Sequence, residues 1–290
     1  MLPQAKGASL VRGAGGNGER AGMRVMTDLR RLSREIRRDI LETSKLADVG
    51  HIGSCLSVAD LLAAMYGSSL RIPDLESAER DRFIMSKGHA ALALYAALHS
   101  SGLLSAEELS RYCQDGSAVG GHPEHELAGI EFSTGSLGHG LCLGAGVALA
   151  ARLSGRSYRT FVLMSDAECN EGSVWEAASF AAHHRLANLV MLVDANGQQA
   201  FGYTRDVLDM SPLSERWGSF GWDVTEVDGN DPFAIAAAVA SVDTTTGPPH
   251  ALIAATTFGK GVSFMENQIP WHYLPMSDEQ YRQALREVAE

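Results

Sequence analysis

The sequence predicts an α/β fold in which a mainly parallel, twisted sheet carries helices on both faces. Two observations lead to this class. Hydrophobic runs at 161–164 and 189–193 have the length of buried strands, and the stretch between them has the length of a crossover helix. Further strand-length and helix-length segments continue to alternate along the chain, which favours a parallel sheet covered on both sides.

Length and composition set the size of the fold. The chain has 290 residues, of which 45% are hydrophobic, enough for one large domain with a well-buried core, although two small domains also fit this length. Residues 1–24 carry Gly, Arg and Asn without a hydrophobic core and are expected to form a disordered arm. The predicted domain spans residues 25–290, and its first helix covers 26–48, where apolar residues recur at helical spacing.

The next part of the chain is predicted to contain three helices and a strand. A loop over 49–53 leads to a helix that opens at Ser57, and 83–86 is a short strand. A glycine turn then begins a helix over 90–98, an arrangement in which a helix N-terminus faces an anion. A similar glycine turn precedes a helix over 141–153.

The crossover unit and the last third complete the predicted sheet. A helix over 174–184 joins the two buried runs into one βαβ unit. Strands at 222–227 and 251–256 flank a helix over 232–242. The chain is expected to end in a short helix.

Charge and cysteine content argue against several functions. The net charge of −11 argues against nonspecific binding to nucleic acid or to acidic membranes. No apolar run approaches the length of about 18 residues that predicts a membrane-spanning helix. The cysteines Cys55, Cys113, Cys142 and Cys169 form no C-x-x-C pair, so neither a zinc site nor a disulfide framework is predicted. A small-molecule enzyme of the reducing cytoplasm fits best.

Two polar residues stand at the ends of the two buried runs. Asp166 follows the first run and Asn196 follows the second. Because a crossover makes the strands parallel, both side chains reach the carboxyl edge of one sheet, where ligands of open α/β folds gather. Carboxylate and amide oxygens suit Mg²⁺ or Ca²⁺ held together with phosphate oxygens. A strand-end Asp or Asn is also commonly a helix cap or turn residue, so both roles stay open.

Histidines and carboxylates gather in the predicted loops. Four histidines lie in loops, and three of them directly follow a glycine: His51, His89, His122 and His272. Imidazoles suit recognition of sugar hydroxyls and proton transfer beside a phosphate, whereas a loop histidine bonded to backbone is the structural alternative. Glu171 and Glu176 flank the start of the crossover helix, where a helix-dipole role is equally ordinary.

Five segments together resemble the thiamine diphosphate domain of transketolase. They are, in chain order, Gly50-His51-Ile52-Gly53, Ser86-Lys87-Gly88-His89, Gly121-His122-Pro123-Glu124, Thr134-Gly135-Ser136-Leu137-Gly138 and the step from Asp166 to Asn196. The loop at 259–267 with Trp271-His272 is similar to that of split transketolases, whose N-terminal subunit is a separate chain. The resemblance runs from about Met26 to the end and implies the thiamine diphosphate-binding fold.

The resemblance also implies a set of site residues. Asp166, Asn196 and the main-chain carbonyl of Gln198 would hold Mg²⁺ or Ca²⁺, which in turn holds the cofactor diphosphate. The implied cofactor contacts are His89, Gly135, Ser136, Leu137, Asp166, Ala167, Glu168, Asn196 and His272. The implied sugar-binding residues are His51, His89, His122 and His272. Catalytic roles are implied for His51 and His272, and for Glu171 and Glu176 in an inter-subunit carboxylate network.

The family's reaction moves a two-carbon ketol unit from a ketose, or its phosphate, to an aldehyde or other acceptor, with thiamine diphosphate as electron sink. The glutamate that activates the cofactor lies, in this family, in a pyrimidine-binding domain. Neither that domain nor the C-terminal domain matches this chain, and we therefore expect a separate C-terminal subunit, an α2β2 assembly and no activity of this chain alone. The expected ligand is a ketose donor, and neither nucleic acid nor a membrane is an expected partner. The acceptor is open and a role in specialised metabolism is expected.

One motif departs from the family pattern. Where the family has Gly-Asp-Gly, this chain has Ser165-Asp166-Ala167. A Cβ at the second glycine position adds bulk beside the phosphate, or strain of about 1 kcal/mol or more if the backbone there needs a positive φ. A non-catalytic assembly or regulatory subunit is therefore an alternative interpretation, and deoxyxylulose-phosphate synthesis is another thiamine-dependent one.

Overall fold

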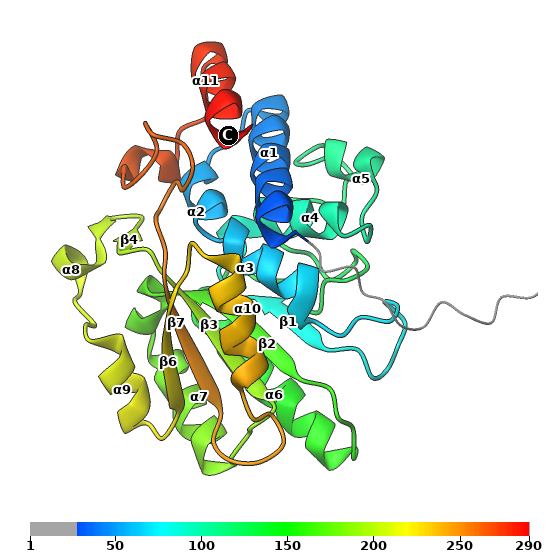
Figure 1. Cartoon of the computed structure of the whole chain (residues 1–290), viewed down its shortest axis with the longest axis vertical. Helices are drawn as coiled ribbons and strands as arrows, with labels where there is room; N and C mark the ends of the chain where they lie inside the picture. Colours follow the sequence, from blue (N-terminus) through cyan, green and yellow to red (C-terminus); the bar gives the residue numbers. More distant parts are fainter. Residues whose placement is uncertain (1–27, 290) are drawn as a thin grey trace, which may run out of the picture.

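A five-stranded sheet forms the centre of the molecule. The computed structural model describes residues 28–289, so the predicted N-terminal arm lies outside the described residues. The strand order is β1-β2-β3-β7-β6, and each neighbouring pair is parallel, which confirms the predicted parallel sheet (Figure 1). The strands are β1 Arg82–Met85, β2 Thr160–Ser165, β3 Leu189–Ala195, β6 Asp223–Asp228 and β7 His250–Ala255.

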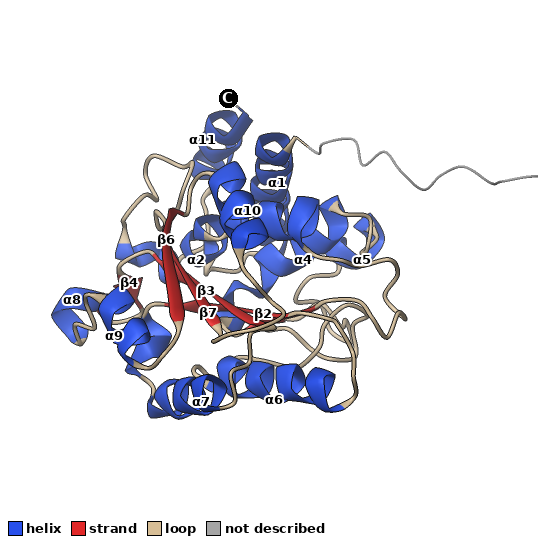
Figure 2. Cartoon of the chain, turned by 60° about the horizontal axis from the view of Figure 1, so that its bottom comes forward, coloured by secondary structure: helices blue, strands red, loops and turns tan. Residues whose placement is uncertain are grey.

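Helices cover both faces of this sheet, as predicted. Figure 2 shows α6 and α7 on one side and α1, α4 and α10 on the other. The long helices are α1 Leu29–Ala47, α4 Ala91–Ser100, α6 His139–Leu153, α7 Gly172–His183, α10 Pro232–Ser241 and α11 Asp278–Ala289. The β2–α7–β3 crossover lies where the hydrophobic runs predicted it.

Shorter elements connect these layers. They are α2 Ile52–Ser57, α3 Ala59–Ala64, the π-helix η1 Met65–Ser69, the 3₁₀ turns η2 Gly88–Ala90, η3 Ala167–Asn170 and η4 Ile269–His272, α5 Ala106–Ser110, α8 Thr204–Val207, α9 Leu213–Ser219, and the antiparallel pair β4 Gln198–Gln199 and β5 Gly202–Tyr203. None of the helices that the structure describes is long and apolar enough to cross a membrane.

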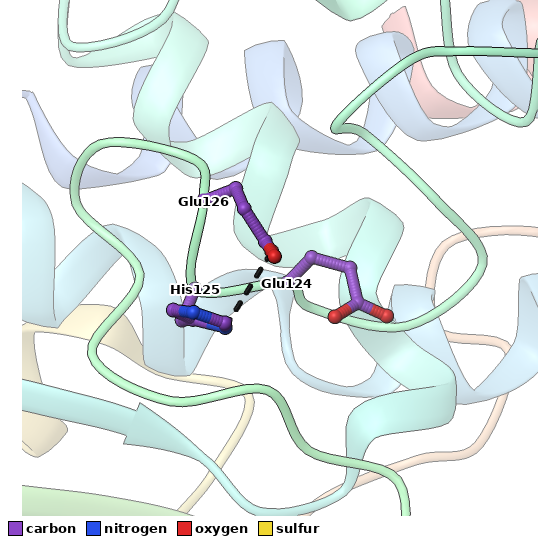
Figure 3. Close-up of side chains that lie close together, drawn as sticks. All are labelled: Glu124, His125 and Glu126. Carbon is purple, nitrogen blue, oxygen red and sulfur yellow. Dashed lines mark ion pairs between the residues drawn. The ribbon is translucent and has the colours of Figure 1, made fainter.

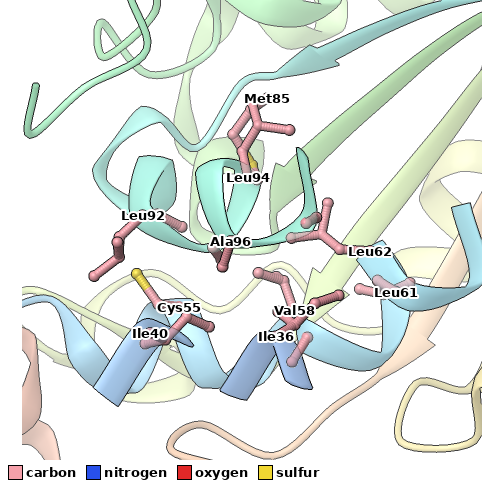
Figure 4. Close-up of a cluster of buried hydrophobic side chains, with 14 of the residues drawn as sticks. Ile36, Ile40, Cys55, Val58, Leu61, Leu62, Met85, Leu92, Leu94 and Ala96 are labelled. Atoms are coloured by element: carbon pink, nitrogen blue, oxygen red, sulfur yellow. The ribbon is translucent and has the colours of Figure 1, made fainter. Parts of the chain in front are cut away.

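The core is divided by the sheet into two hydrophobic clusters. Successive residues of β2 point to opposite faces, so Phe161 and Leu163 join one cluster while Val162 and Met164 join the other. Figure 4 shows part of the larger cluster, where α1, α3 and α4 pack together. Because both faces are covered, β2 and β3 are buried along nearly their whole length, which explains their uninterrupted hydrophobic sequences.

The helix predicted to open at Ser57 corresponds to α3, which begins at Ala59, and the short helix α2 before it was not predicted. The loop expected over 49–53 ends at His51, whose positive φ of 62° turns the chain into α2. Ser57 ends α2 instead of opening a helix. Its hydroxyl donates hydrogen bonds to the Ser54 carbonyl, at 3.0 Å, and to the Asp194 carboxylate, at 2.8 Å. Ser57 therefore connects α2 to the end of β3.

Candidate functional site

A pocket of about 230 Å³ lies where the loops after β1, β2 and β3 meet. The carboxyl ends of parallel strands open at this edge, so the polar residues that follow each strand converge there. The predicted site residues that line the pocket are His51, His89, His122, Gly135, Leu137, Ala167, Asn196, Gln198 and His272. The lining does not include the predicted residues Ser136, Asp166, Glu168, Glu171 and Glu176.

Asp166 and Asn196 come together as their positions after β2 and β3 predicted. The Asp166 carboxylate accepts a hydrogen bond from the Gly197 amide at 2.9 Å, and the Asp166 amide donates to the Asp194 carbonyl at 3.2 Å. The Asn196 side-chain oxygen accepts from the Gln198 amide at 2.9 Å. The loops after β2 and β3 are therefore joined here, and we call these two residues with their loops the Asp166–Asn196 cluster. Their role as metal ligands stays a prediction.

The electrostatics of the Asp166–Asn196 cluster suit a cation. Burial, reinforced by the neighbouring Asp194 carboxylate, raises the pKa of Asp166 to about 7. A divalent ion beside the carboxylate would hold it ionised at neutral pH. Carboxylate, amide and main-chain carbonyl oxygens are the donor types that Mg²⁺ and Ca²⁺ prefer, so the residues present fit such an ion.

Lys87 and Asp194 form a buried ion pair that the sequence analysis did not predict. Both side chains are fully buried, and Lys87 lines the pocket. The Asp194 carboxylate also accepts hydrogen bonds from Ser57, at 2.8 Å, from Asn196, at 2.8 Å, and from Thr256. These contacts connect α2 and the ends of β3 and β7 to the Asp166–Asn196 cluster. The position of Lys87 next to a predicted strand end, within Ser86-Lys87-Gly88-His89, was the sequence signal that could have identified it.

Three of the four predicted histidines have a lowered pKa. Burial and the Lys87 charge lower the pKa of His89 well below its usual value, and the same two causes lower the pKa of His272 to about 4. Burial and His122 lower the pKa of His51. These imidazoles are therefore neutral at pH 7, where each carries one donor and one acceptor nitrogen.

Several buried polar atoms around the pocket form no hydrogen bond with the described residues. They are Nδ1 of His51, Nε2 of His272, and both the oxygen and the nitrogen of the Gln198 amide. The Nε2 atom of His89, by contrast, lies 3.1 Å from the Ser54 hydroxyl. Buried polar groups are nearly always paired in native proteins, so these atoms are suited to contact a polar ligand.

Glu168 holds three loops of the site together. Its carboxylate accepts hydrogen bonds from the Ser86 hydroxyl at 2.5 Å, the Gly138 amide at 3.0 Å and the Ser165 amide at 2.8 Å. The side chain is fully buried behind these loops. Its predicted direct contact with a cofactor therefore stays a prediction, whereas its contacts position the loops that follow β1 and β2.

Ala167 fits the backbone without strain. It begins η3, follows a residue in the right-handed helical region, and is not among the described residues with positive φ. Its amide donates to the Asp166 carboxylate at 2.8 Å. The neighbouring Ser165 is extended at the end of β2, and its hydroxyl accepts from the Glu168 amide at 3.3 Å. The Ser-Asp-Ala sequence thus gives no conformational reason for the loss of a site.

Gly135 is required where it stands. Its φ is 147°, and an added Cβ would lie 2.6 Å from the ring of His122. This close approach holds His122 against the pocket wall. A side chain at position 135 would displace the imidazole.

Glu171, Glu176 and Ser136 are exposed on the surface beside the pocket. Glu171 packs against the turn before α6, because a Cβ on Gly138 would lie 2.6 Å from the Glu171 Cβ. Their exposure is compatible with a face covered by another subunit. Their predicted catalytic and cofactor roles stay predictions.

A second group of possible metal ligands lies outside the pocket. Among residues 28–289, Glu124, His125 and Glu126 place ligand atoms within 4.8 Å of one another, and all three are exposed (Figure 3). The Ser133 hydroxyl donates to Glu124 at 2.7 Å and lies 3.0 Å from the His125 ring. These contacts account for the cluster without an ion.

Comparison with known proteins gives a consistent result. Residues 29–288 match the family described as "Transketolase, thiamine diphosphate binding domain". The chain is 43% identical over 260 residues to one of the subunits of the apulose-4-phosphate transketolase of Phocaeicola vulgatus, covering 89% of this chain and 92% of that protein. It is 35% identical over 264 residues to a 6-deoxy-6-sulfo-D-fructose transketolase subunit of a Clostridium species, covering 90% of this chain and 96% of that protein.

Solved transketolases have the same fold. The transketolase of Leishmania mexicana superposes with a TM-score of 0.83 at 28% identity, covering 91% of this chain and 42% of that chain. The transketolase of Pichia stipitis, as an R525L mutant, gives a TM-score of 0.80 at 31% identity. This chain therefore spans less than half the length of the solved structures, with 40% and 42% of those chains covered.

Proposed function

Because the chain belongs to the transketolase family, through its thiamine diphosphate-binding domain, we propose that it is the cofactor-binding subunit of a two-subunit transketolase. The enzyme would transfer a two-carbon ketol unit from a ketose donor to an acceptor. The observation that carries this proposal is the pocket in which the Asp166–Asn196 cluster meets the loops of four histidines. Two relatives named as subunits match this chain over 92% and 96% of their own lengths, which supports a separate partner.

The Asp166–Asn196 cluster would hold the cofactor through a divalent cation. Asp166, Asn196 and the Gln198 main-chain carbonyl supply hard oxygen ligands, for which Mg²⁺ is the proposed ion and Ca²⁺ a substitute. Lys87, paired with Asp194, also lines this pocket. His89 and His272 line the same pocket and would donate to diphosphate oxygens from their ring nitrogens.

The histidines would position the sugar and move protons. Thiamine diphosphate, when bound, supplies the electron sink for the broken carbon-carbon bond. His51, His122 and His272 line the pocket and would hydrogen-bond the donor hydroxyls. The lowered pKa values of His51 and His272 keep each ring neutral, so that each would accept a hydrogen bond from one hydroxyl and donate one to another. A partner that covers the pocket would also exclude water from the reacting carbons.

The partner would complete the site. We propose that it carries the pyrimidine-binding domain with the activating glutamate, and that two copies of each chain assemble as α2β2. The exposed Glu171 and Glu176 would face this partner. The relatives act on apulose 4-phosphate and 6-deoxy-6-sulfo-D-fructose by their names, which supports a donor from a specialised sugar pathway.

Calorimetry with thiamine diphosphate and Mg²⁺ tests this function. The chain is titrated alone and as a complex with a pyrimidine-domain subunit, taken from the adjacent gene where one is present. We expect strong binding and ketose turnover by the complex, and no turnover by the chain alone. Turnover of a ketose by the isolated chain, or a complex that binds no cofactor, contradicts the proposal.

A matched pair of variants locates the site. Asp166→Ala is expected to abolish cofactor binding and activity, because the carboxylate is the only charged member of the proposed ligand set. Asp228→Ala is the control, since Asp228 is an exposed aspartate at the end of β6, at the same edge of the sheet. Equal cofactor affinity of the two variants would remove Asp166 from the site.

A further inference from the structure

We propose that the side-chain amide of Gln198 forms hydrogen bonds with hydroxyl groups of the ketose donor and helps to set donor specificity. This inference rests on the proposed function and adds a residue to it. The proposed metal contact of Gln198 uses its main-chain carbonyl and leaves the side chain unassigned.

The Gln198 amide is a buried polar group without a protein partner. Only 3% of the residue is exposed, it lines the pocket, and neither its oxygen nor its nitrogen forms a hydrogen bond within residues 28–289. Removing a primary amide from water without a compensating bond is strongly unfavourable. The side chain thus stands in a position that a bound polar group would stabilise.

Main-chain contacts fix the position of Gln198 in the pocket wall. The main-chain N–H of Gln198 donates to the side-chain oxygen of Asn196 at 2.9 Å, and Gln198 pairs with Tyr203 in the β4–β5 hairpin. The Tyr273 hydroxyl donates to the Ala200 carbonyl at 2.9 Å and ties the hairpin to the loop that carries His272. Gln198 is therefore held beside the loop that carries His272 and beside the Asp166–Asn196 cluster.

The neighbouring Gln199 shows the contrast. Its amide nitrogen donates to the Asn170 side-chain oxygen at 3.3 Å. The two glutamines are adjacent in sequence, yet only Gln198 has both amide atoms buried and unpaired. Gln199 is half-buried and paired, whereas Gln198 is buried and its amide has no partner within the described residues.

The chemistry of the unpaired atoms selects the ligand. Gln198 offers one acceptor and two donor hydrogens, and His51 and His272 each present an unpaired ring nitrogen in the same pocket. Diphosphate oxygens only accept, so they would leave the Gln198 oxygen unpaired. Hydroxyl groups both donate and accept, and neighbouring hydroxyls on one carbon chain satisfy both atoms of the amide. A polyhydroxylated donor is the ligand that matches this set.

The Gln198→Met variant tests the assignment, because methionine keeps the length and shape of the side chain and removes the amide. Gln283→Met, in α11 and outside the pocket lining, is the control. In the complex loaded with Mg²⁺ and thiamine diphosphate, we expect the KM for a ketose phosphate such as xylulose 5-phosphate to rise about tenfold in Gln198→Met, as for loss of one or two hydrogen bonds. The KM of Gln283→Met should stay within about twofold.

Two measurements apart from turnover separate the outcomes. The calorimetric Kd for thiamine diphosphate should be unchanged in Gln198→Met, and the cofactor-free chain should melt about 2 °C higher, because an unpaired buried amide has been removed. A weakened cofactor Kd with an unchanged KM would assign the amide to the cofactor and overturn the donor assignment. Unchanged KM and Kd would overturn the inference and leave the proposed function intact. A wild-type complex that turns over no ketose would overturn both.

Discussion

Ala167 is one of the two residues that stand where the family resemblance implies glycine, and its backbone shows why an alanine fits there. It lies in η3 with a negative φ, so the position does not need the freedom of glycine. We predict that Ala167→Gly lowers the free energy of unfolding by about 0.5–1 kcal/mol, because glycine loses more conformational entropy on folding. Urea denaturation of the cofactor-free chain measures this change. A stability gain would show that the alanine is strained.

His272 makes stability depend on pH. Its pKa is about 4 in the folded chain, against 6.5 for an unperturbed histidine, so the unfolded chain binds a proton first as the pH falls. The contribution of His272 is therefore neutral above pH 6.5 and destabilising below it, with the penalty growing down to about pH 4. We predict that the urea midpoint of wild type, measured relative to that of a variant without this imidazole, is lower at pH 5 than at pH 7.5.

The variant His272→Gln isolates this effect. Asp166, whose pKa is raised by burial, acts in the opposite direction over the same range and is common to both proteins. Wild type should therefore lose more stability than His272→Gln between pH 7.5 and pH 5. Parallel pH profiles for the two proteins would contradict the lowered pKa of His272.

At the scale of elements, α6 depends on small residues to lie close to the sheet. A Cβ on Gly144 would lie 2.4 Å from a methyl carbon of Val162 in β2, whereas a Cβ on Gly146 would meet no atom within 4 Å. We predict that Gly144→Ala lowers the free energy of unfolding by about 1–3 kcal/mol through overpacking. Gly146→Ala, in the same helix, should raise it by about 0.5–1 kcal/mol. Urea denaturation of both variants checks this, and equal effects would contradict the packing of α6.

The elements that the sequence predicted well are those with strong local signals. The β2–α7–β3 unit has two uninterrupted hydrophobic strands, and such runs mark buried parallel strands wherever they are long enough. The start of α2 was missed because Gly53 resembles a loop residue. In the structure its role is packing, since a Cβ there would lie 2.1 Å from the ring of Phe258. That contact depends on residues far away in the sequence.

The same division applies to the site. The convergence of Asp166 and Asn196 follows from parallel strands alone, and glycine neighbours marked three of the histidines. The pairing of Lys87 with Asp194 joins residues 107 positions apart, and the Glu168 carboxylate reaches Ser86 across 82 positions. No local pattern specifies such contacts. Charged residues near the ends of buried strands are therefore worth testing as partners of one another.

At the scale of the whole molecule, cofactor and partner should bind cooperatively. If the cofactor lies between unlike subunits, each ligand adds contacts for the other, and the two affinity changes must be equal by thermodynamic linkage. We predict that saturating Mg²⁺ and thiamine diphosphate tighten partner binding by about 5- to 150-fold, and that the partner tightens cofactor binding by the same factor. Calorimetry of both steps measures the two ratios. Independent binding would place the cofactor wholly within one chain.

The Lys87–Asp194 pair restricts how this sequence can change over time. Both side chains are fully buried, and replacing one alone would leave a buried charge without its partner, at a loss of about 3–5 kcal/mol. An intermediate carrying only one of the two changes would be close to unfolding for a domain of ordinary stability. Substitutions at positions 87 and 194 should therefore be inherited together, and a lineage that lost this pair would have passed through a compensating change elsewhere in the cluster.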